Sequence, residues 1–569
     1  MQGQLYSKLG NYFNNWHILL IIALTVLVYL PASRGSFIFD DNSLIKNNSY
    51  IRESHSAFSY LSQEDGIADE IDKGVIHTGY YRPLTNFTYH FDYLLWGMDA
   101  KGFRTSNIIL HIVNVLLLYF LIKYLFLNKT AAFFSTMIFA LHPANTEAIS
   151  MIVNRNNLLA LLFFLSSFYC YLQSMEKGRP GLFTLSVFLF GLSIFSKEIG
   201  IMGIGVFFLY NRIMSSSKKN ILNEFLSYLP YLLVIIAYMV MRFYVTGPSF
   251  IRFDLNELLM RIYYAPWLCC YNLFIILLPW KLHSYGVSYP ADPANFAVIA
   301  SIILFIAVTI FIILFRKKYR IVAFSAAAFL LALFPVLNII PKASLSLVAL
   351  RWLYFPLIFI ALFVAFIIKS IKQERQVILF TILITIICYL GIYSLTLNRY
   401  LWYDEKMFLT QEANNFGNKL YMGSYAALLY EEKKIDEAEK YYLMAINAYP
   451  MLTDSYNGYA SLLIINKGRI DEAYNVLKKA EKLNKMSYQR QEWLHLMGLV
   501  KINQGNSKES LNYLFKAISI KQNPEIYNSI FIAYMALNEK EKALFYLRKG
   551  LELDSNNEVL IGNLKKISP

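Results

Sequence analysis

The chain has 569 residues, of which 57% are hydrophobic and 16% aromatic while only 16% are charged, and its mean hydropathy is +0.41. This composition excludes an ordinary soluble protein and predicts a polytopic membrane protein with a polar part attached. The net charge of +15 does not indicate nucleic-acid binding, because Lys and Arg cluster in short segments between apolar runs and in the polar C-terminal region. Such clustering is typical of cytoplasmic loops.

The first apolar run extends from about Trp16 to Leu30 and has Lys8 before it. One interpretation of this run is a cleaved secretory signal. We favour an uncleaved first span, because no clean A-x-A site follows and apolar segments continue along most of the chain.

A membrane span needs about 20 apolar residues. The runs that qualify lie near residues 14–31, 104–126, 131–149, 156–174, 181–197, 198–213, 224–245, 296–315, 321–340, 351–370 and 376–397. Residues 261–280 are also apolar, but Pro266 and Pro279 interrupt them, so a re-entrant or surface-lying segment is as open as a crossing. About eleven spans then place the N-terminus and the basic loops inside and the C-terminus outside.

This topology places the polar segments of interest on one extracytoplasmic face. The largest are the loop 32–103 and a second extracytoplasmic segment, 246–295. A connector as long as the first loop is more often functional than idle.

Asp40 and Asp41 follow directly on the first span. Adjacent carboxylates at a membrane surface repel each other, and burial raises the pKa of one of them, so the pair is a candidate base or metal ligand. The alternative is an interfacial cap of the next helix. We favour a catalytic role, in which one Asp caps and its neighbour accepts a proton.

The turn 142–155, with the sequence HPANTEAISMIVNR, offers Glu147, His142 and Arg155 as further site candidates. Glu147 is either functional or a helix-start charge favoured by the helix dipole. His142 is more often a hydrogen-bonding residue at a span end than a metal ligand. We expect no metal site, because spaced sets of His, Cys and carboxylate ligands are missing from the sequence. The four cysteines all lie in apolar segments without paired spacing.

Three cations lie on the same predicted face, each beside an apolar segment: Arg82, Lys197 and Arg351. Pairing with Glu198 or Asp92 would make some of them structural. A lipid phosphate would satisfy them equally well, and Arg offers a bidentate geometry for it. Carboxylates and cations on one face of a membrane core favour a reaction in which a phosphate leaves.

From about residue 414 the chain repeats itself every 34 residues or so, which predicts about four tetratricopeptide (TPR) repeats over 414–569. Small residues flank an aromatic residue or leucine at matching positions, and Pro450 follows the first set: Ala438, Tyr442, Ala445 and Pro450; Ala473, Leu477 and Ala480; Ser510, Leu514 and Ala517; Ala543, Leu547 and Gly550. The predicted fold is therefore all-α, with a membrane helical bundle over 1–400 followed by a TPR α-solenoid that presents a concave surface to a peptide or protein.

Several motifs, taken in order, resemble one known family: FIFDD, YYRPLTNFTYHFDYLLWG, FALHPANTEAISMIVNRNNLLALLFFL, FSKEIGI, RWLYFPLIF and then the repeats. Together they are similar to the transmembrane and tetratricopeptide-repeat (TMTC-type) O-mannosyltransferases of the GT-C glycosyltransferase superfamily. The resemblance covers nearly the whole chain. It is loosest over RFDLNELLMRIYYAPWLCCYNLFIILLPWKLHSYGVSY.

The resemblance implies an inverting transfer of a mannose-like hexose from a polyprenyl-phosphate donor to a protein Ser or Thr hydroxyl, without a metal. Asp40 or Asp41 would deprotonate the acceptor, and Glu147 would orient the acceptor or the sugar. Arg351, with Lys197 or Arg82, would stabilise the leaving phosphate.

The short repeat array and the Lys-, Asn- and Ile-rich composition indicate a bacterial relative in the inner membrane, which leaves the sugar and the acceptor open. Two other classes remain as alternatives. One is a non-catalytic, membrane-anchored TPR scaffold for envelope proteins, which would tolerate Asp41→Asn. The other is a transporter of lipid-linked sugars, in which charges would line a path through the spans rather than gather at one end.

Overall fold

The computed structural model describes residues 16–53, 59–62, 80–214, 221–247, 254–282, 284, 289–339, 347–483 and 487–567. Most of the predicted loop 32–103 between residues 54 and 79, and much of 341–350, lie outside the described residues. Over the described residues the chain divides into two compact units, the first ending at Phe408 and the second beginning at Leu409. Every described secondary-structure element is helical.

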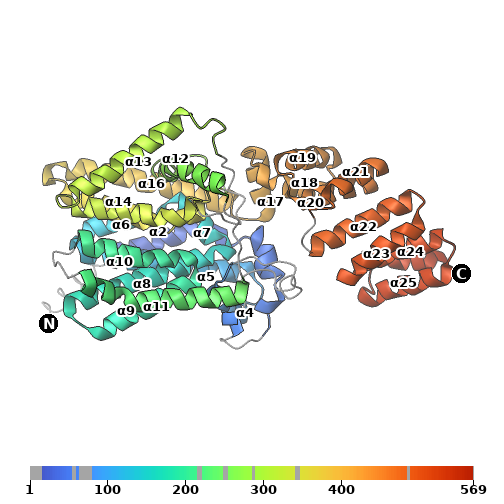
Figure 1. The fold of residues 1–569 in the computed structure, drawn as a ribbon, viewed down its shortest axis with the longest axis horizontal. Helices are drawn as coiled ribbons and strands as arrows, with labels where there is room; N and C mark the ends of the chain where they lie inside the picture. The colour runs from blue at the N-terminus through green and yellow to red at the C-terminus, as the bar shows by residue number, and fades with distance from the viewer. Residues whose placement is uncertain are drawn as a thin grey trace, which may run out of the picture. The chain divides into compact units, whose positions relative to one another are not determined.

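Unit 1 is a bundle of apolar helices (Figure 1). Seven of its described helices are long and apolar enough to cross a membrane: α2 (Trp16–Ser33), α5 (Ala100–Phe126), α8 (Arg155–Lys177), α11 (Ile221–Thr246), α12 (Leu255–Leu277), α13 (Phe296–Phe315) and α16 (Gln376–Tyr400). Shorter apolar helices complete it: α6 (Lys129–Leu141), α9 (Pro180–Ser196), α10 (Met202–Ile213), α14 (Arg320–Leu333) and α15 (Leu357–Ser370). The chain is thus a multi-pass membrane protein.

Some polar side chains inside the bundle form hydrogen bonds between helices. Ser167 of α8 and Ser186 of α9 each donate a hydrogen bond to the other's backbone carbonyl, at 2.7 and 2.8 Å. Such small polar residues let apolar helices approach closely while leaving no donor unpaired in a hydrocarbon environment.

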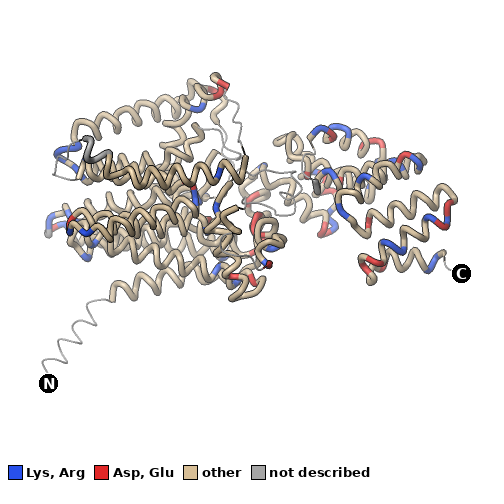
Figure 2. The backbone as a smooth tube through the Cα atoms, turned by 60° about the horizontal axis from the view of Figure 1, so that its bottom comes forward, with Lys and Arg blue, Asp and Glu red and all other residues tan. Residues whose placement is uncertain are grey.

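The basic loops gather at one end of unit 1 (Figure 2). Lys369 at the end of α15 donates to the carbonyl of Phe126 at the end of α5, at 3.0 Å. Tyr124 of α5 donates to Glu176 of α8 beside them. The carboxylates and cations singled out from the sequence lie on the connections at the opposite ends of these helices.

Several helices are shorter than the predicted spans at the end of unit 1 where these carboxylates and cations lie, which we call the site end. The predicted span 131–149 ends as a helix at Leu141 and continues as η4 (Pro143–Asn145) and α7 (Thr146–Ser150). The predicted spans beginning at 198 and 351 likewise begin with single turns, η6 (Glu198–Ile201) and η8 (Leu350–Leu353). Polar residues in apolar runs end the long helices there, because their side chains bond to the backbone of neighbouring turns. The site residues therefore lie on short elements.

Helix α12 contains most of residues 261–280, and the sequence leaves open whether this segment crosses the membrane. Its length would allow a crossing. Its first half holds Arg261, which donates to the carbonyl of Asn338 after α14, and Tyr263, which donates to the carbonyl of Pro293 before α13. Its last turn accepts a hydrogen bond from His142 at Ile276. Both halves thus contact site-end connections, which supports a segment that does not cross.

Unit 2 consists of four antiparallel helix pairs and a final helix. They are α18 (Met422–Glu431) with α19 (Ile435–Ala448), α20 (Thr453–Leu462) with α21 (Ile470–Ala480), α22 (Ser487–Asn503) with α23 (Ser507–Ile520), α24 (Pro524–Ala536) with α25 (Lys540–Leu553), and α26 (Glu558–Ile567).

Of the thirteen repeat positions chosen from the sequence, twelve are buried and Pro450 is exposed. A Cβ on Gly550 would lie 3.2 Å from the Cβ of Tyr527, so that position admits little more than glycine. The predicted TPR architecture is confirmed.

Candidate functional site

The two adjacent aspartates have different environments. Asp41 is fully buried, and its carboxylate accepts hydrogen bonds from the backbone N–H groups of Ile38 at 3.3 Å and Val153 at 2.9 Å. Burial raises the pKa of Asp41 to about 6, although the Arg104 guanidinium and the backbone donors lower it. Asp41 therefore holds its loop against the turn before α8.

Asp40 is partly buried, and its carboxylate has no hydrogen-bond partner among the described residues. Burial raises its pKa; the Arg351 guanidinium opposes that shift and the Glu147 carboxylate adds to it. Both groups therefore act on Asp40 electrostatically. A carboxylate with a raised pKa and free lone pairs is suited to accept a proton.

Glu147 is fully buried in α7, and Arg351 in η8 is its partner. The Arg351 backbone N–H donates to the Glu147 carboxylate at 2.9 Å, and the guanidinium forms an ion pair with the same carboxylate. The structure thus brings together three candidates from distant parts of the chain, namely Asp40, Glu147 and Arg351.

A second cluster comes from the start of α4 (Pro83–Trp96) and the end of α9. The Arg82 guanidinium donates to both carboxylate oxygens of Glu198, at 2.8 and 3.2 Å. Burial raises the pKa of Glu198, but Arg82, and to a smaller extent Lys197, outweigh it and bring the pKa to about 2. Arg82 thus has the structural partner that the sequence left open.

Polar contacts connect the two clusters. Lys197 donates to the side-chain oxygen of Asn157 at 2.6 Å, and the Asn157 amide donates to the carbonyl of Asn154 at 3.0 Å. The Asn154 amide in turn donates to the Glu147 carbonyl at 3.1 Å. All three cations chosen from the sequence therefore belong to one hydrogen-bonded region.

Two other candidates are structural in this geometry. Arg155 is buried and bonded to Asp92, to the side chain of Asn107 at 2.7 Å and to the carbonyl of Phe103 at 2.9 Å. His142 is buried with both ring nitrogens occupied by backbone groups, of Ile276 at 2.8 Å and of Ala144 at 3.1 Å. Burial lowers the pKa of His142 to about 4.

No group of three or more His, Cys, Asp or Glu side chains in the described part of the chain is arranged to hold a metal. Metal independence stays a prediction.

The sequence reasoning missed two residues that hold this end of unit 1 together. Arg104 is fully buried and donates to the carbonyls of Ala32 and Ser150, each at 2.9 Å, and to that of Ser36. Trp402 is also fully buried, and its indole N–H donates to the Thr146 hydroxyl at 2.9 Å. Arg104 could have been selected from the sequence, because it lies at the start of an apolar run. No local sequence pattern marks Trp402.

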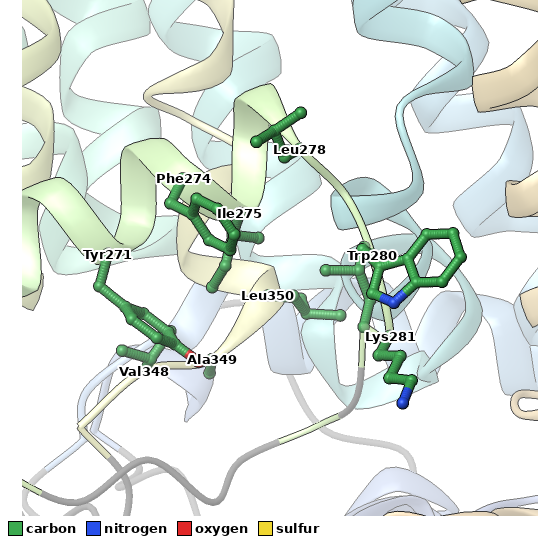
Figure 3. Close-up of a pocket in the computed structure, with 10 residues that line it drawn as sticks. Tyr271, Phe274, Ile275, Leu278, Trp280, Lys281, Val348, Ala349 and Leu350 are labelled. Atoms are coloured by element: carbon green, nitrogen blue, oxygen red, sulfur yellow. The ribbon is translucent and has the colours of Figure 1, made fainter.

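A pocket is lined in part by residues 348–350, which directly precede Arg351 in the chain (Figure 3). One part of its wall comes from α12, and the rest comes from the segment after α12 and from the residues immediately before Arg351. The lining side chains are Tyr271, Phe274, Ile275, Leu278, Trp280, Lys281, Leu282, Val348, Ala349 and Leu350. All but Lys281 have apolar or aromatic side chains, while the exposed surface of the pocket is mixed, polar and apolar.

Comparisons with known proteins agree with this architecture. The family profile described as dolichyl-phosphate-mannose-protein mannosyltransferase matches residues 81–244, which contain Arg82, Glu147 and Lys197. The profile of the tetratricopeptide repeat matches residues 525–557, which are α24 and α25. The fold and these matches define a multi-pass membrane protein with TPR repeats and a region similar to the mannosyltransferase family.

Individual relatives are more specific. Protein O-mannosyl-transferase TMTC1 of Mus musculus is 32% identical over 216 residues, which are 36% of this chain and 23% of the mouse protein. Protein O-mannosyl-transferase F38B6.6 of Caenorhabditis elegans is 26% identical over 371 residues, 63% of this chain and 52% of the nematode protein. The chain therefore matches between about a quarter and a half of these relatives' length. It is a TMTC-like protein.

Proposed function

We propose that the chain is an inverting glycosyltransferase of the GT-C type, which moves a mannose-like hexose from a polyprenyl-phosphate donor to a Ser or Thr hydroxyl of a protein. The observation that carries this proposal is the placement of the unpartnered Asp40 carboxylate beside the Glu147–Arg351 ion pair. The similarity to relatives named as protein O-mannosyl-transferases supports the reaction class.

Asp40, rather than Asp41, is the base in this proposal. The carboxylate of Asp41 already accepts two backbone hydrogen bonds in a fully buried position, whereas that of Asp40 is accessible. Asp40 takes the proton of the acceptor hydroxyl as its oxygen bonds to the anomeric carbon. The bond between that carbon and the phosphate oxygen breaks on the opposite side, and the lipid phosphate leaves with the electron pair.

Arg351 stabilises the charge that develops on the leaving phosphate. Its guanidinium is partly exposed beside the fully buried Glu147, so it can face a ligand while remaining fixed by its partner. Fixed charges aimed at a developing charge are the most effective form of electrostatic catalysis. Lys197 and Arg82 add positive potential, and Glu147 orients Arg351 and the acceptor.

The pocket lined by Val348, Ala349 and Leu350 marks the side from which the donor lipid approaches Arg351 in this proposal. Leu350 lines this pocket and directly precedes Arg351 in the chain, so a lipid phosphate on this side lies near the guanidinium. Lys281 at the same pocket offers a second cation. No metal is needed for this chemistry, because the fixed cations neutralise the phosphate.

The site faces the extracytoplasmic side of a bacterial inner membrane in this proposal, with the N-terminus cytoplasmic and the TPR unit extracytoplasmic. The gathering of basic loops at the other end of unit 1 supports that orientation, since such loops stay in the cytoplasm (Figure 2). The donor lipid is then an undecaprenyl-type phosphate. The TPR unit binds the acceptor protein or a partner that delivers it.

A transfer assay tests the proposal. Membranes containing wild type, Asp40→Asn or Asp41→Asn at matched expression are given radiolabelled polyprenyl-phosphate sugars, with endogenous envelope proteins as acceptors. We expect label in wild type and none with Asp40→Asn, while Asp41→Asn loses folded protein along with activity. Equal label in all three, or none with any donor, would overturn the proposal in favour of a TPR scaffold.

A further inference from the structure

The segment from Trp402 to Phe408, which we call the strap, follows the last membrane helix and precedes the repeats in the chain. It belongs to unit 1. The ring of Trp402 stacks obliquely against that of Phe408, with centroids 5.6 Å apart. Both residues are fully buried. The mechanism proposed above makes no use of them.

One end of this aromatic pair contacts the turn that carries Glu147. The Trp402 indole N–H donates to the hydroxyl of Thr146 at 2.9 Å, and that hydroxyl donates to the carbonyl of Pro143 at 2.8 Å. Thr146 is fully buried, and its hydroxyl both donates and accepts, so the hydroxyl is fixed in direction. Trp402 thereby holds the residue immediately before Glu147.

The other end contacts the residue immediately before Asp40. The rings of Phe408 and Phe39 lie 6.1 Å apart. Phe39 has a φ of +46°, in the left-handed region that a bulky side chain rarely adopts. Such a conformation persists only where its surroundings impose it, and Phe408 is one of those surroundings.

Backbone and polar contacts hold the strap in place between these two ends. The carbonyl of Tyr403 accepts from the N–H of Ser36 at 3.1 Å. A Cβ on Gly35 would lie 1.8 Å from that carbonyl oxygen, so only glycine admits this approach. Asn42 donates to the Glu405 carboxylate at 2.9 Å.

From these contacts we propose that Trp402 and Phe408 are positioning residues, which set the placement of Asp40 relative to Glu147 and Arg351. The inference rests on the proposed transferase function and adds residues from the end of unit 1 to its site. Neither residue touches substrate. Each acts through the residue preceding a carboxylate, Trp402 through Thr146 and Phe408 through Phe39.

Full-length variants in membranes test the inference. Trp402→Phe keeps the aromatic ring and removes the indole N–H, while Phe408→Ala removes the contact with Phe39 and Phe408→Leu restores part of its volume. The exposed residues Trp16 and Phe296 provide matched controls, Trp16→Phe and Phe296→Ala. Asp40→Asn, measured in parallel, reports whether the chain is a transferase that uses Asp40 at all.

We expect kcat to fall at least 10-fold in Phe408→Ala and 3-fold or more in Trp402→Phe, relative to the folded protein present. The KM for donor should be unchanged, and Phe408→Leu should recover part of the loss. In the profile of kcat against pH, the acid limb should also move to lower pH in Phe408→Ala. Burial is the largest contribution to the raised pKa of Asp40. A loosened loop exposes Asp40 to solvent and therefore lowers its pKa.

Two results overturn the inference while leaving the transferase proposal standing. One is wild-type kcat and an unmoved acid limb in both variants, while Asp40→Asn is inactive. The other is a loss that matches the loss of folded protein and leaves the acid limb unmoved, which a merely structural role produces. Wild-type activity in Asp40→Asn would instead defeat the use of that base itself.

Discussion

The charged residues of the two units differ in their burial and in how they are bonded. At the site end of unit 1, Glu147 and Arg104 are fully buried, and each is held by several directed hydrogen bonds. In the TPR repeats, Arg469 pairs with Glu439 of a neighbouring helix and with Glu472 three residues further along the chain, and its guanidinium lies at the surface. Burying a charge is costly unless every donor and acceptor is satisfied, whereas exposed pairs are nearly neutral for stability.

This difference separates function from architecture. A buried ionic network is retained only where its chemistry or its positioning is needed, since apolar residues of the same size pack at lower cost. The repeats require only small and large apolar residues in register, as at Ala543, Leu547 and Gly550. Charge substitutions should therefore be severe in unit 1 and mild in unit 2.

The largest effect is expected for Asp40→Asn. Removing a general base at a transfer site costs about 10²–10⁴-fold in rate. Transfer of labelled sugar should fall by about 10³-fold, with little change in the amount of folded protein, because Asp40 makes no side-chain hydrogen bond to any described residue. Measurable transfer at more than a tenth of the wild-type rate would point to a different base.

The second-largest loss of transfer rate is expected for Arg351→Gln. Loss of a fixed group facing the leaving phosphate costs about 10²–10³-fold in kcat, whereas Arg351→Lys keeps the charge and should retain part of the rate. Binding of polyprenyl phosphate alone, measured by its protection against thermal denaturation, should weaken in the Gln variant only. Equal protection in both variants would remove Arg351 from the phosphate site.

Arg104→Met should act on folding rather than on chemistry. Removing one partner from a buried ionic contact destabilises by about 3–5 kcal/mol, and Arg104 holds three segments by their carbonyls. The detergent-solubilised variant should melt at a lower temperature than Arg34→Met, its exposed control. Similar melting of the two variants would show that the buried network contributes little.

Glu147→Gln should shift the acid limb of the activity profile. The Glu147 carboxylate raises the pKa of Asp40, so removing its charge lowers that pKa and leaves the base ionised at lower pH. The rising limb of kcat/KM against pH should move to lower pH. Glu198→Gln serves as the control, because Glu198 is not among the charges that act on Asp40. An unmoved limb in Glu147→Gln would separate Glu147 from the base.

The smallest effect is expected for Arg469→Gln in the repeats. The Arg469 guanidinium lies at the surface, where solvent replaces its contacts with Glu439 and Glu472. Melting temperature and sugar transfer should both stay at wild-type values. A large loss of transfer to a protein acceptor, with transfer to a short peptide retained, would instead place Arg469 at the acceptor surface.

The sequence by itself determined the two-part architecture and the repeats. Hydropathy locates apolar helices because each must satisfy its own backbone in lipid, and the spacing of small and large residues defines the TPR pairs because helix contact depends on it. The motifs also selected Asp40, Asp41, Glu147 and Arg351, since charged residues beside apolar runs are costly and therefore conspicuous.

Only the tertiary structure decided which aspartate is free and which charges pair. Asp41 differs from Asp40 because its carboxylate accepts a hydrogen bond from the backbone N–H of Val153, more than a hundred residues away in the chain. Arg351 meets Glu147 across 204 residues, Arg155 meets Asp92 across 63, and Trp402 meets Thr146 across 256. Partners so distant in the chain leave no local pattern, because their contact depends on how the whole bundle packs.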